Sequence, residues 1–156
     1  MMESVENAIA NLTDSSLAVP LDERIDDLER CMLDLPQAEC PVVHHFGPGL
    51  YIREMTAAAG TLIIGHAHKG EHMNILLKGK VRILNELGVP EVLEAPAVFI
   101  AKPGRKIALV LEDMVWQNIY ATTETDLDKI DELFIDKSQA WIEHNESKAL
   151  LMDEEA

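Results

Sequence analysis

Short runs of alternating apolar and polar residues fill the middle of the chain, and turn residues separate them. Apolar positions that recur every second residue are typical of half-buried β-strands. The predicted strands are residues 50–56, 61–65, 72–77, 80–84, 91–93, 98–101, 107–111 and 115–121. Eight short strands with no long helix between them predict an all-β sandwich or barrel.

Helical spacing precedes this β region. Between Pro20 and Pro36, apolar residues recur three or four positions apart, at Leu21, Ile25, Leu28, Met32 and Leu35. This spacing predicts an amphipathic helix that ends before Pro36. Its apolar side needs a surface to cover, and the pattern leaves open whether that surface belongs to the same barrel or to a neighbouring subunit. Residues 3–18 give a weaker helix signal.

Helical spacing also returns after residue 122. Thr125 is predicted to cap one helix, with Ile130 on its apolar side, and Ser138 to cap a second helix that carries Trp141. We therefore expect an acidic helical arm at residues 1–36, a barrel at 37–122 and acidic C-terminal helices at 123–156.

The charge is divided in the same way along the chain. Residues 1–36 hold 9 acidic and 2 basic residues, a net charge of −7, and residues 123–156 hold 11 and 3, a net charge of −8. The 8 acidic and 8 basic residues between them balance. An acidic excess argues against a nucleic-acid partner held through its phosphates. Solvated faces of peripheral helices explain it better than a basic partner bound by the acidic arms, or mimicry of nucleic acid.

Export and membrane insertion are not indicated. No apolar run approaches the roughly 20 residues that span a bilayer, and the N-terminus lacks the basic start and apolar stretch of a signal peptide. We expect a cytoplasmic protein with no membrane partner.

Three histidines stand close together in the β region. His66 and His68 share one face of a strand, because alternate side chains point the same way, so both could reach one metal ion. A third ligand should follow the turn at Lys69-Gly70, where either Glu71 or His72 can face inward with them.

This segment resembles the first motif of the cupin superfamily, in which glycine, His-x-His, glutamate and glycine recur at fixed spacing. Gly60, His66, His68 and Gly79 fall in register, and His72 occupies the glutamate position. The resemblance implies a double-stranded β-helix, the cupin or jelly-roll barrel, with N-terminal and C-terminal α-helical extensions. It makes His72 the third metal ligand and Glu71 the alternative ligand.

The second cupin motif is matched only in part. Gly88, Pro96, Phe99 and Pro103-Gly104 resemble it, but Lys106 stands where cupins have a fourth ligand, a histidine. A protonated lysine cannot coordinate a cation. The expected site therefore has three imidazole ligands and open positions, which suits a divalent transition metal such as Zn, Fe, Ni or Mn.

Three polar and aromatic residues share one face of the last predicted strand: Trp116, Asn118 and Tyr120. If that face looks inward, these residues line the cavity beside the histidines together with Lys106. Alternatively, Trp116 and Tyr120 pack under the terminal helices.

The chain from residue 41 to 122 also looks like small cupin proteins encoded by tailed bacteriophages. That resemblance implies a non-catalytic accessory, assembly or virion-associated protein, located in the host cytoplasm or the virion. Our first hypothesis is thus a metal-binding, non-catalytic cupin that forms a homo-oligomer through its acidic arms. The alternatives are a metal-dependent dioxygenase, isomerase or lyase acting on a small molecule, with Glu71 or Lys106 moving protons, and an acidic inhibitor that mimics nucleic acid.

Overall fold

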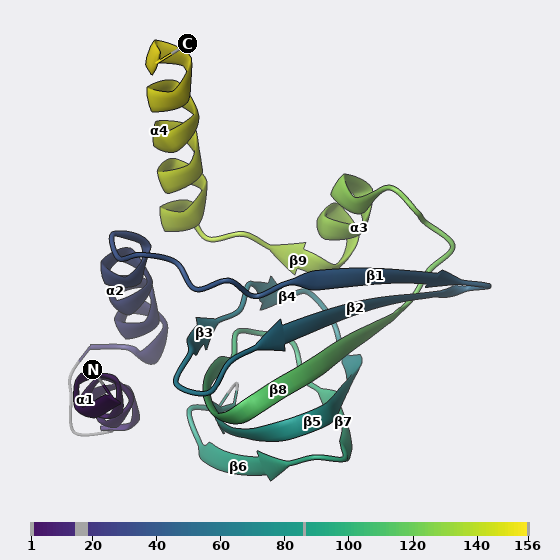
Figure 1. The fold of residues 1–156 in the computed structure, drawn as a ribbon, viewed down its shortest axis with the longest axis horizontal. Coiled ribbons are helices and arrows are strands. Elements are labelled where there is room, and N and C mark those ends of the chain that lie inside the picture. Colours follow the sequence, from purple (N-terminus) through teal and green to yellow (C-terminus); the bar gives the residue numbers. More distant parts are fainter. Residues whose placement is uncertain (1, 15–18, 86, 156) are drawn as a thin grey trace. The chain divides into compact units, whose positions relative to one another are not determined.

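The chain folds into two compact units. The computed structural model describes residues 2–14, 19–85 and 87–155. One unit, here called the helical unit, joins residues 1–37 with residues 137–156, and the other, the barrel unit, comprises residues 38–136 (Figure 1). The predicted boundary at 122/123 falls before helix α3 (Leu127–Phe134) and strand β9 (Ile135–Asp136), which the structure groups with the barrel.

Antiparallel strands build the barrel unit. The remaining strands are β1 (Val42–Gly47), β2 (Leu50–Ala57), β3 (Leu62–Ile64), β4 (Ala67–His68), β5 (His72–Leu84), β6 (Pro90–Glu94), β7 (Ala97–Ala101) and β8 (Ile107–Ala121). Their order is β1-β2-β8-β5-β6, with β3 paired to β8 and β7 paired to β5. The two long central strands pair with each other, and each also has two further partners: β5 pairs first with β7 and then with β6, and β8 first with β3 and then with β2. This confirms the all-β prediction.

The central strands are longer than the alternation suggests. Residues 72–77 and 80–84 form the single strand β5, and residues 107–111 and 115–121 form β8. Register irregularities in the β5–β8 ladder between Leu76 and Val81 explain the break in the pattern, because an irregular pairing bends a strand without ending it. The hairpin strand β1 was not predicted, since His44-His45-Phe46 carries no alternation.

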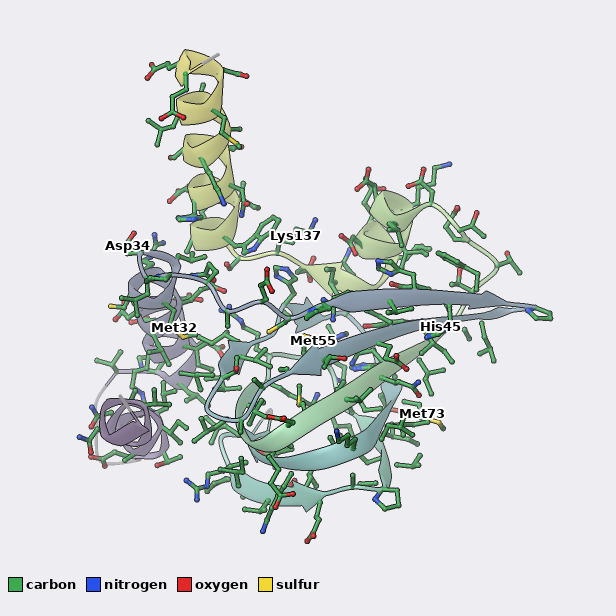
Figure 2. The ribbon with its side chains drawn as sticks, viewed as in Figure 1. Met32, Asp34, His45, Met55, Met73 and Lys137 are labelled. Carbon is green, nitrogen blue, oxygen red and sulfur yellow. The ribbon has the colours of Figure 1, made fainter. Side chains whose placement is uncertain are left out.

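The barrel interior consists of rows of residues paired across β2, β8, β5 and β7. An apolar row contains Met55, Trp116, Leu76 and Ala97. A polar row contains Arg53, Asn118 and Asn74, and ends at Phe99. A third row, here called the mouth row, contains Tyr51, Tyr120, His72 and Ala101. Intervening residues such as Met73 point away from the interior (Figure 2).

The helical unit contains α1 (Met2–Thr13), α2 (Leu21–Leu33) and α4 (Gln139–Glu155). The amphipathic helix predicted before Pro36 is confirmed as α2, which buries Ile25 and Glu29. Ser138 caps α4 as predicted, since its hydroxyl accepts from the Trp141 amide at 3.1 Å, and it also donates to the Glu29 carboxylate.

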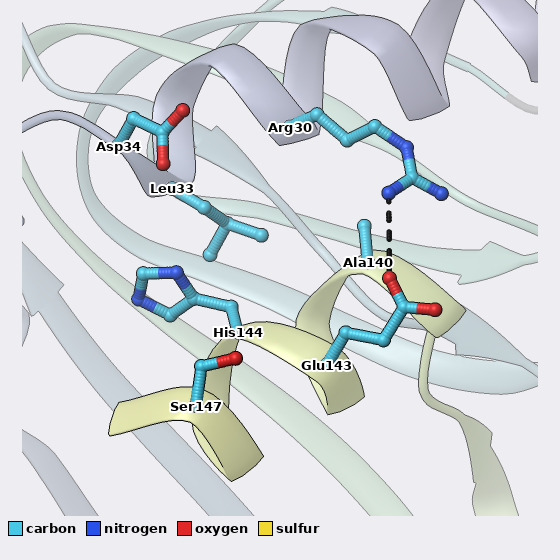
Figure 3. A pocket seen from close by; sticks show the side chains of 7 residues that line it. All are labelled: Arg30, Leu33, Asp34, Ala140, Glu143, His144 and Ser147. Carbon is cyan, nitrogen blue, oxygen red and sulfur yellow. Dashed lines mark ion pairs between the residues drawn. The ribbon is translucent and has the colours of Figure 1, made fainter. Parts of the chain in front are cut away.

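A shallow hollow of about 350 Å³ lies between α2 and α4 beside the ion pair of Arg30 and Glu143, whose atoms are 3.6 Å apart (Figure 3). No histidine of the predicted metal set lines it. Among the described helices, none is both long enough and apolar enough to cross a membrane.

The N-cap of α3 differs from the prediction. Asp126, not Thr125, is the capping residue, and its carboxylate accepts from the amides of Asp128 and Lys129. Glu124 accepts from the amides of both Thr125 and Asp126, so it holds the turn one residue before the cap. The prediction of Thr125 as the cap was therefore wrong by one residue.

Candidate metal and ligand site

Two of the three predicted ligands meet at the mouth row. His72 is the first residue of β5 and is buried, and His68 lies on β4. Their ring centroids are 3.9 Å apart and the ring planes are tilted by only 21°, so the imidazoles stack face to face. His66 precedes β4, outside any strand, so its orientation is not fixed by the strand alternation used to predict it.

Backbone contacts hold β4 in place from both sides. The short strand pairs with β9, and His68 exchanges backbone hydrogen bonds with Gly104 at 2.9 and 3.0 Å. The Lys69 amide donates to the Phe134 carbonyl at 2.9 Å. These contacts fix a two-residue strand that would have no stability alone, and with it the position of the His68 ring.

Tyr120 ties the histidines to the sheet. Its hydroxyl and His68 Nε2 are hydrogen-bonded at 2.8 Å, and its ring stacks against His72 at 5.5 Å and Tyr51 at 5.8 Å. On the other side the ring contacts Phe134 of α3, at 4.7 Å between centroids. Both sequence-based alternatives thus hold for Tyr120, which faces the histidines and also packs under a helix.

Two of the other predicted cavity residues, Trp116 and Asn118, also face inward. Trp116 lies in the apolar core, edge-on to Phe99 at 5.5 Å, and not under a terminal helix. Asn118 donates through Nδ2 to Asn74 Oδ1 at 2.7 Å. The Lys106 carbonyl accepts from the Gly65 amide at 3.1 Å, which places Lys106 beside the residue that precedes His66.

Burial and nearby cations keep the His68 imidazole neutral. The pKa of His68 is lowered to about 3, first by burial, which disfavours the charged ring, and then by the positive charge of His72, Lys106, His66 and Arg53. Burial likewise raises the pKa of Tyr120 above its usual value. At neutral pH the imidazole and the phenol are therefore both uncharged.

Glu71 points elsewhere. Its carboxylate pairs with Lys102 Nζ at 2.6 Å, and its side chain is 54% exposed. Since β5 turns only one of the two neighbouring residues inward, the structure favours His72 over Glu71 as the inward-facing residue.

Several interior polar residues were not predicted as part of the site. Arg53, which follows Tyr51 by two positions, shares its inward face, and Asn74 follows His72 in the same way. His44 lies within hydrogen-bonding distance of the Tyr51 hydroxyl, at 2.6 Å from Nδ1. These residues could have been found by counting every second position from a residue known to face inward. That residue is known only once the register between the strands is known.

The donor chemistry of the cluster fits a transition metal. His72 Nδ1 lies 3.4 Å from the Gly70 carbonyl oxygen, to which a protonated Nδ1 donates. A neutral imidazole with its second nitrogen bonded to a carbonyl is typical of metal ligands. Within the described parts of the chain, however, no three His, Cys, Asp or Glu side chains are grouped closely enough to hold one ion. The set His66, His68 and His72 stays a prediction.

No protein-family model matches the chain, and no curated protein does. Among solved structures, a protein with a double-stranded β-helix domain from Klebsiella pneumoniae is similar over 62% of this chain and 90% of its own, with 17% identity and a TM-score of 0.48.

KdgF from a Halomonas species is similar over 60% of this chain and 90% of its own, with 17% identity and a TM-score of 0.46. A cupin superfamily protein from Desulfitobacterium hafniense matches 60% of this chain and 86% of its own, with 13% identity and a TM-score of 0.45. The fold assignment itself rests on the strand pairing of this chain, in which β5 and β8 each pair with two strands in succession. Residues 38–136 form a double-stranded β-helix, the fold of the cupin superfamily.

Proposed function

We propose that the protein is a metal-binding cupin-fold protein whose barrel binds and does not catalyse. The observation that carries this proposal is the pair of imidazoles at the mouth row, His68 and His72, with centroids 3.9 Å apart. Because the pKa of His68 lies near 3, no proton competes with a metal for that ring at neutral pH.

The position of Lys106 supports a binding role over a catalytic one. Its Nζ atom is buried and its charge acts on His68, so a cation stands near the place where cupins carry a fourth imidazole ligand. An ammonium group cannot coordinate a cation, so the ligand set of the reactive cupins is changed at this position, and a fold can be kept without the reaction. A dioxygenase, isomerase or lyase stays the alternative hypothesis from the sequence.

Metal content of tag-free protein tests the proposal. We expect about one Zn, Ni, Mn or Fe ion per chain after loading and desalting, measured by elemental analysis, and a rise in melting temperature because the metal binds only the folded state. His68→Ala and His72→Ala should each abolish both effects.

His45→Ala is the matched control. His45 lies on the outer face of β1, 3.7 Å from the Glu54 carboxylate and on a different strand from His68 and His72, so its loss should leave metal content unchanged. Metal content near zero in the wild type, or equal metal loss in the His45 variant, would contradict the proposal.

Self-association and the phage role stay predictions from the sequence. The outer face of β5 and β7 exposes apolar side chains that an oligomer would cover. They are Met73, Leu77, Val98 and Ile100. Light scattering on the purified full chain measures the oligomeric state directly.

A further inference from the structure

We propose that the polar row of the barrel binds a small molecule through an oxyanion group, a carboxylate or a phosphate, with Arg53, Asn74 and Asn118 facing that group. The proposal goes beyond metal binding and does not depend on it. Three features of the interior support it: a guanidinium, a buried amide donor without an acceptor, and a second cation that adds to the charge of the first.

The first feature is the place of Arg53. It lies on the inward face of β2, opposite His44 of β1 on one side and Asn118 of β8 on the other. It shares the inward face of β2 with Tyr51, two residues earlier, and its positive charge acts on Tyr51, Tyr120 and His68. Guanidinium is the side chain best suited to a planar oxyanion, because it donates two parallel hydrogen bonds.

The second feature is Asn74, which is 1% exposed. Its Oδ1 accepts from Asn118, but its Nδ2 is buried and has no hydrogen-bond acceptor among the described atoms. A buried donor without an acceptor is destabilising and rare in folded proteins. An oxygen of a bound ligand would supply the missing acceptor.

The third feature is the charge of the interior. The inward positions of β2, β8, β5 and β7 carry Arg53 and, in the described chain, no Asp or Glu. Lys106 adds a buried ammonium that acts on His68. One carboxylate, Asp131 of α3, acts on Tyr51 and Tyr120. Two cations against one anion, in surroundings of low dielectric constant, attract a negatively charged ligand.

Calorimetry on metal-free protein tests the proposal with succinate and inorganic phosphate as the two oxyanion probes. Succinamide, the neutral analogue of succinate, is the matched control ligand. We expect saturable binding of at least one oxyanion probe and none of succinamide. The comparison of succinate with phosphate identifies which oxyanion the site prefers.

Substitutions locate the binding. Arg53→Gln and Asn74→Leu should each weaken it about tenfold or more, the usual effect of losing a charge-assisted or buried hydrogen bond. Arg53→Lys should keep part of the affinity, because it retains the charge. Lys102→Met removes a surface cation that is 69% exposed and should have no effect. Circular dichroism establishes that each variant is folded.

The outcomes separate this proposal from metal binding. No saturable binding, equal binding of succinate and succinamide, or undiminished binding in both Arg53→Gln and Arg53→Lys would overturn it. Binding that appears only after metal is added would also overturn it, since the anion would then be a metal ligand. Oxyanion binding in a protein that takes up no metal would support this site and overturn only the metal proposal.

Discussion

Gly79 lies at the irregularity where β5 crosses β8, and its backbone has a φ of +94°. A Cβ atom at this position would meet the Asp113 carbonyl oxygen and come within 2.8 Å of the Glu112 carbonyl oxygen. Both obstacles are backbone atoms of the opposite strand and cannot rotate away. A glycine is therefore required here for two reasons, conformation and space.

Gly79→Ala should lower the free energy of unfolding by more than about 2 kcal/mol, since it combines backbone strain with a steric clash. Urea denaturation measures this change. Gly70→Ala is the matched control, because nothing lies within 4 Å of its added Cβ. A loss equal to that of the control would contradict the assigned close approach.

The neutral state of His68 makes the stability of the metal-free protein depend on pH. Its pKa is about 3 when folded and near 6.5 when unfolded, so the unfolded state binds one more proton between these values. The contribution of His68 to the free energy of unfolding should thus be complete above pH 6.5 and be lost as the pH drops toward 3.

The free energy of unfolding cannot change by more than about 1.4 kcal/mol per pH unit through His68, because one proton is involved. Solvent screening of the partly exposed ring makes the change smaller. Melting temperatures recorded at several pH values between these limits measure the effect. His68→Gln should flatten the curve relative to the wild type, because carboxylates elsewhere titrate equally in both proteins. Parallel curves would show that His68 is not held neutral.

At the scale of elements, helix α3 depends on its cap and on two apolar contacts. Asp126 accepts from the free amides at the helix start, while Ile130 and Phe134 pack against Tyr51 and Tyr120. The helix thereby supports the mouth row of the barrel from outside.

Asp126→Ala should lower the free energy of unfolding by about 1 kcal/mol, the usual cost of losing an N-cap side chain. Thr125→Ala should leave it unchanged, because the Thr125 side chain makes no capping contact in the described structure. Thermal unfolding of the two variants distinguishes the two capping assignments. The opposite order of stabilities would restore Thr125 as the cap.

Local patterns predicted most of the elements and fewer of the site residues. Alternation placed the strands because burial on one side has a period of two, and it grouped His68 with His66 and Tyr120 with Trp116, whereas His72 was chosen over Glu71 by its register in the cupin motif. It divided β5 and β8 in two, since alternation fails where a strand bends. Arg53 was not predicted, because its inward direction depends on pairing with Asn118, 65 positions later in the chain.

For the whole molecule, the two units differ in how much apolar surface they bury. The barrel core contains side chains with almost no exposed area, including Leu76, Val81 and Val110. In the helical unit the described buried apolar residues are fewer: Ile9 and Leu12 of α1, Ile25 of α2 and Ala140 of α4. Stability within a protein follows local burial, so the helical unit should open at lower denaturant concentration than the barrel.

The two tryptophans allow this to be measured, since Trp116 lies in the barrel and Trp141 in α4. In Trp141→Phe, urea should reduce the helical circular dichroism before it changes Trp116 fluorescence. The wild type, with both tryptophans, should show a fluorescence transition in two steps. Coincident transitions in Trp141→Phe would mean that the units unfold as one.

The stack of aromatic rings at the mouth row also gives the site a magnetic signature. His68 and His72 lie face to face, and Tyr120 stacks against both. Ring currents from these neighbours should shift the imidazole C–H protons of both residues upfield, as Tyr51 should shift those of His44, which stacks against it. A proton NMR spectrum of the unmodified protein would therefore register a metal or an oxyanion entering the barrel as a change in these shifted lines.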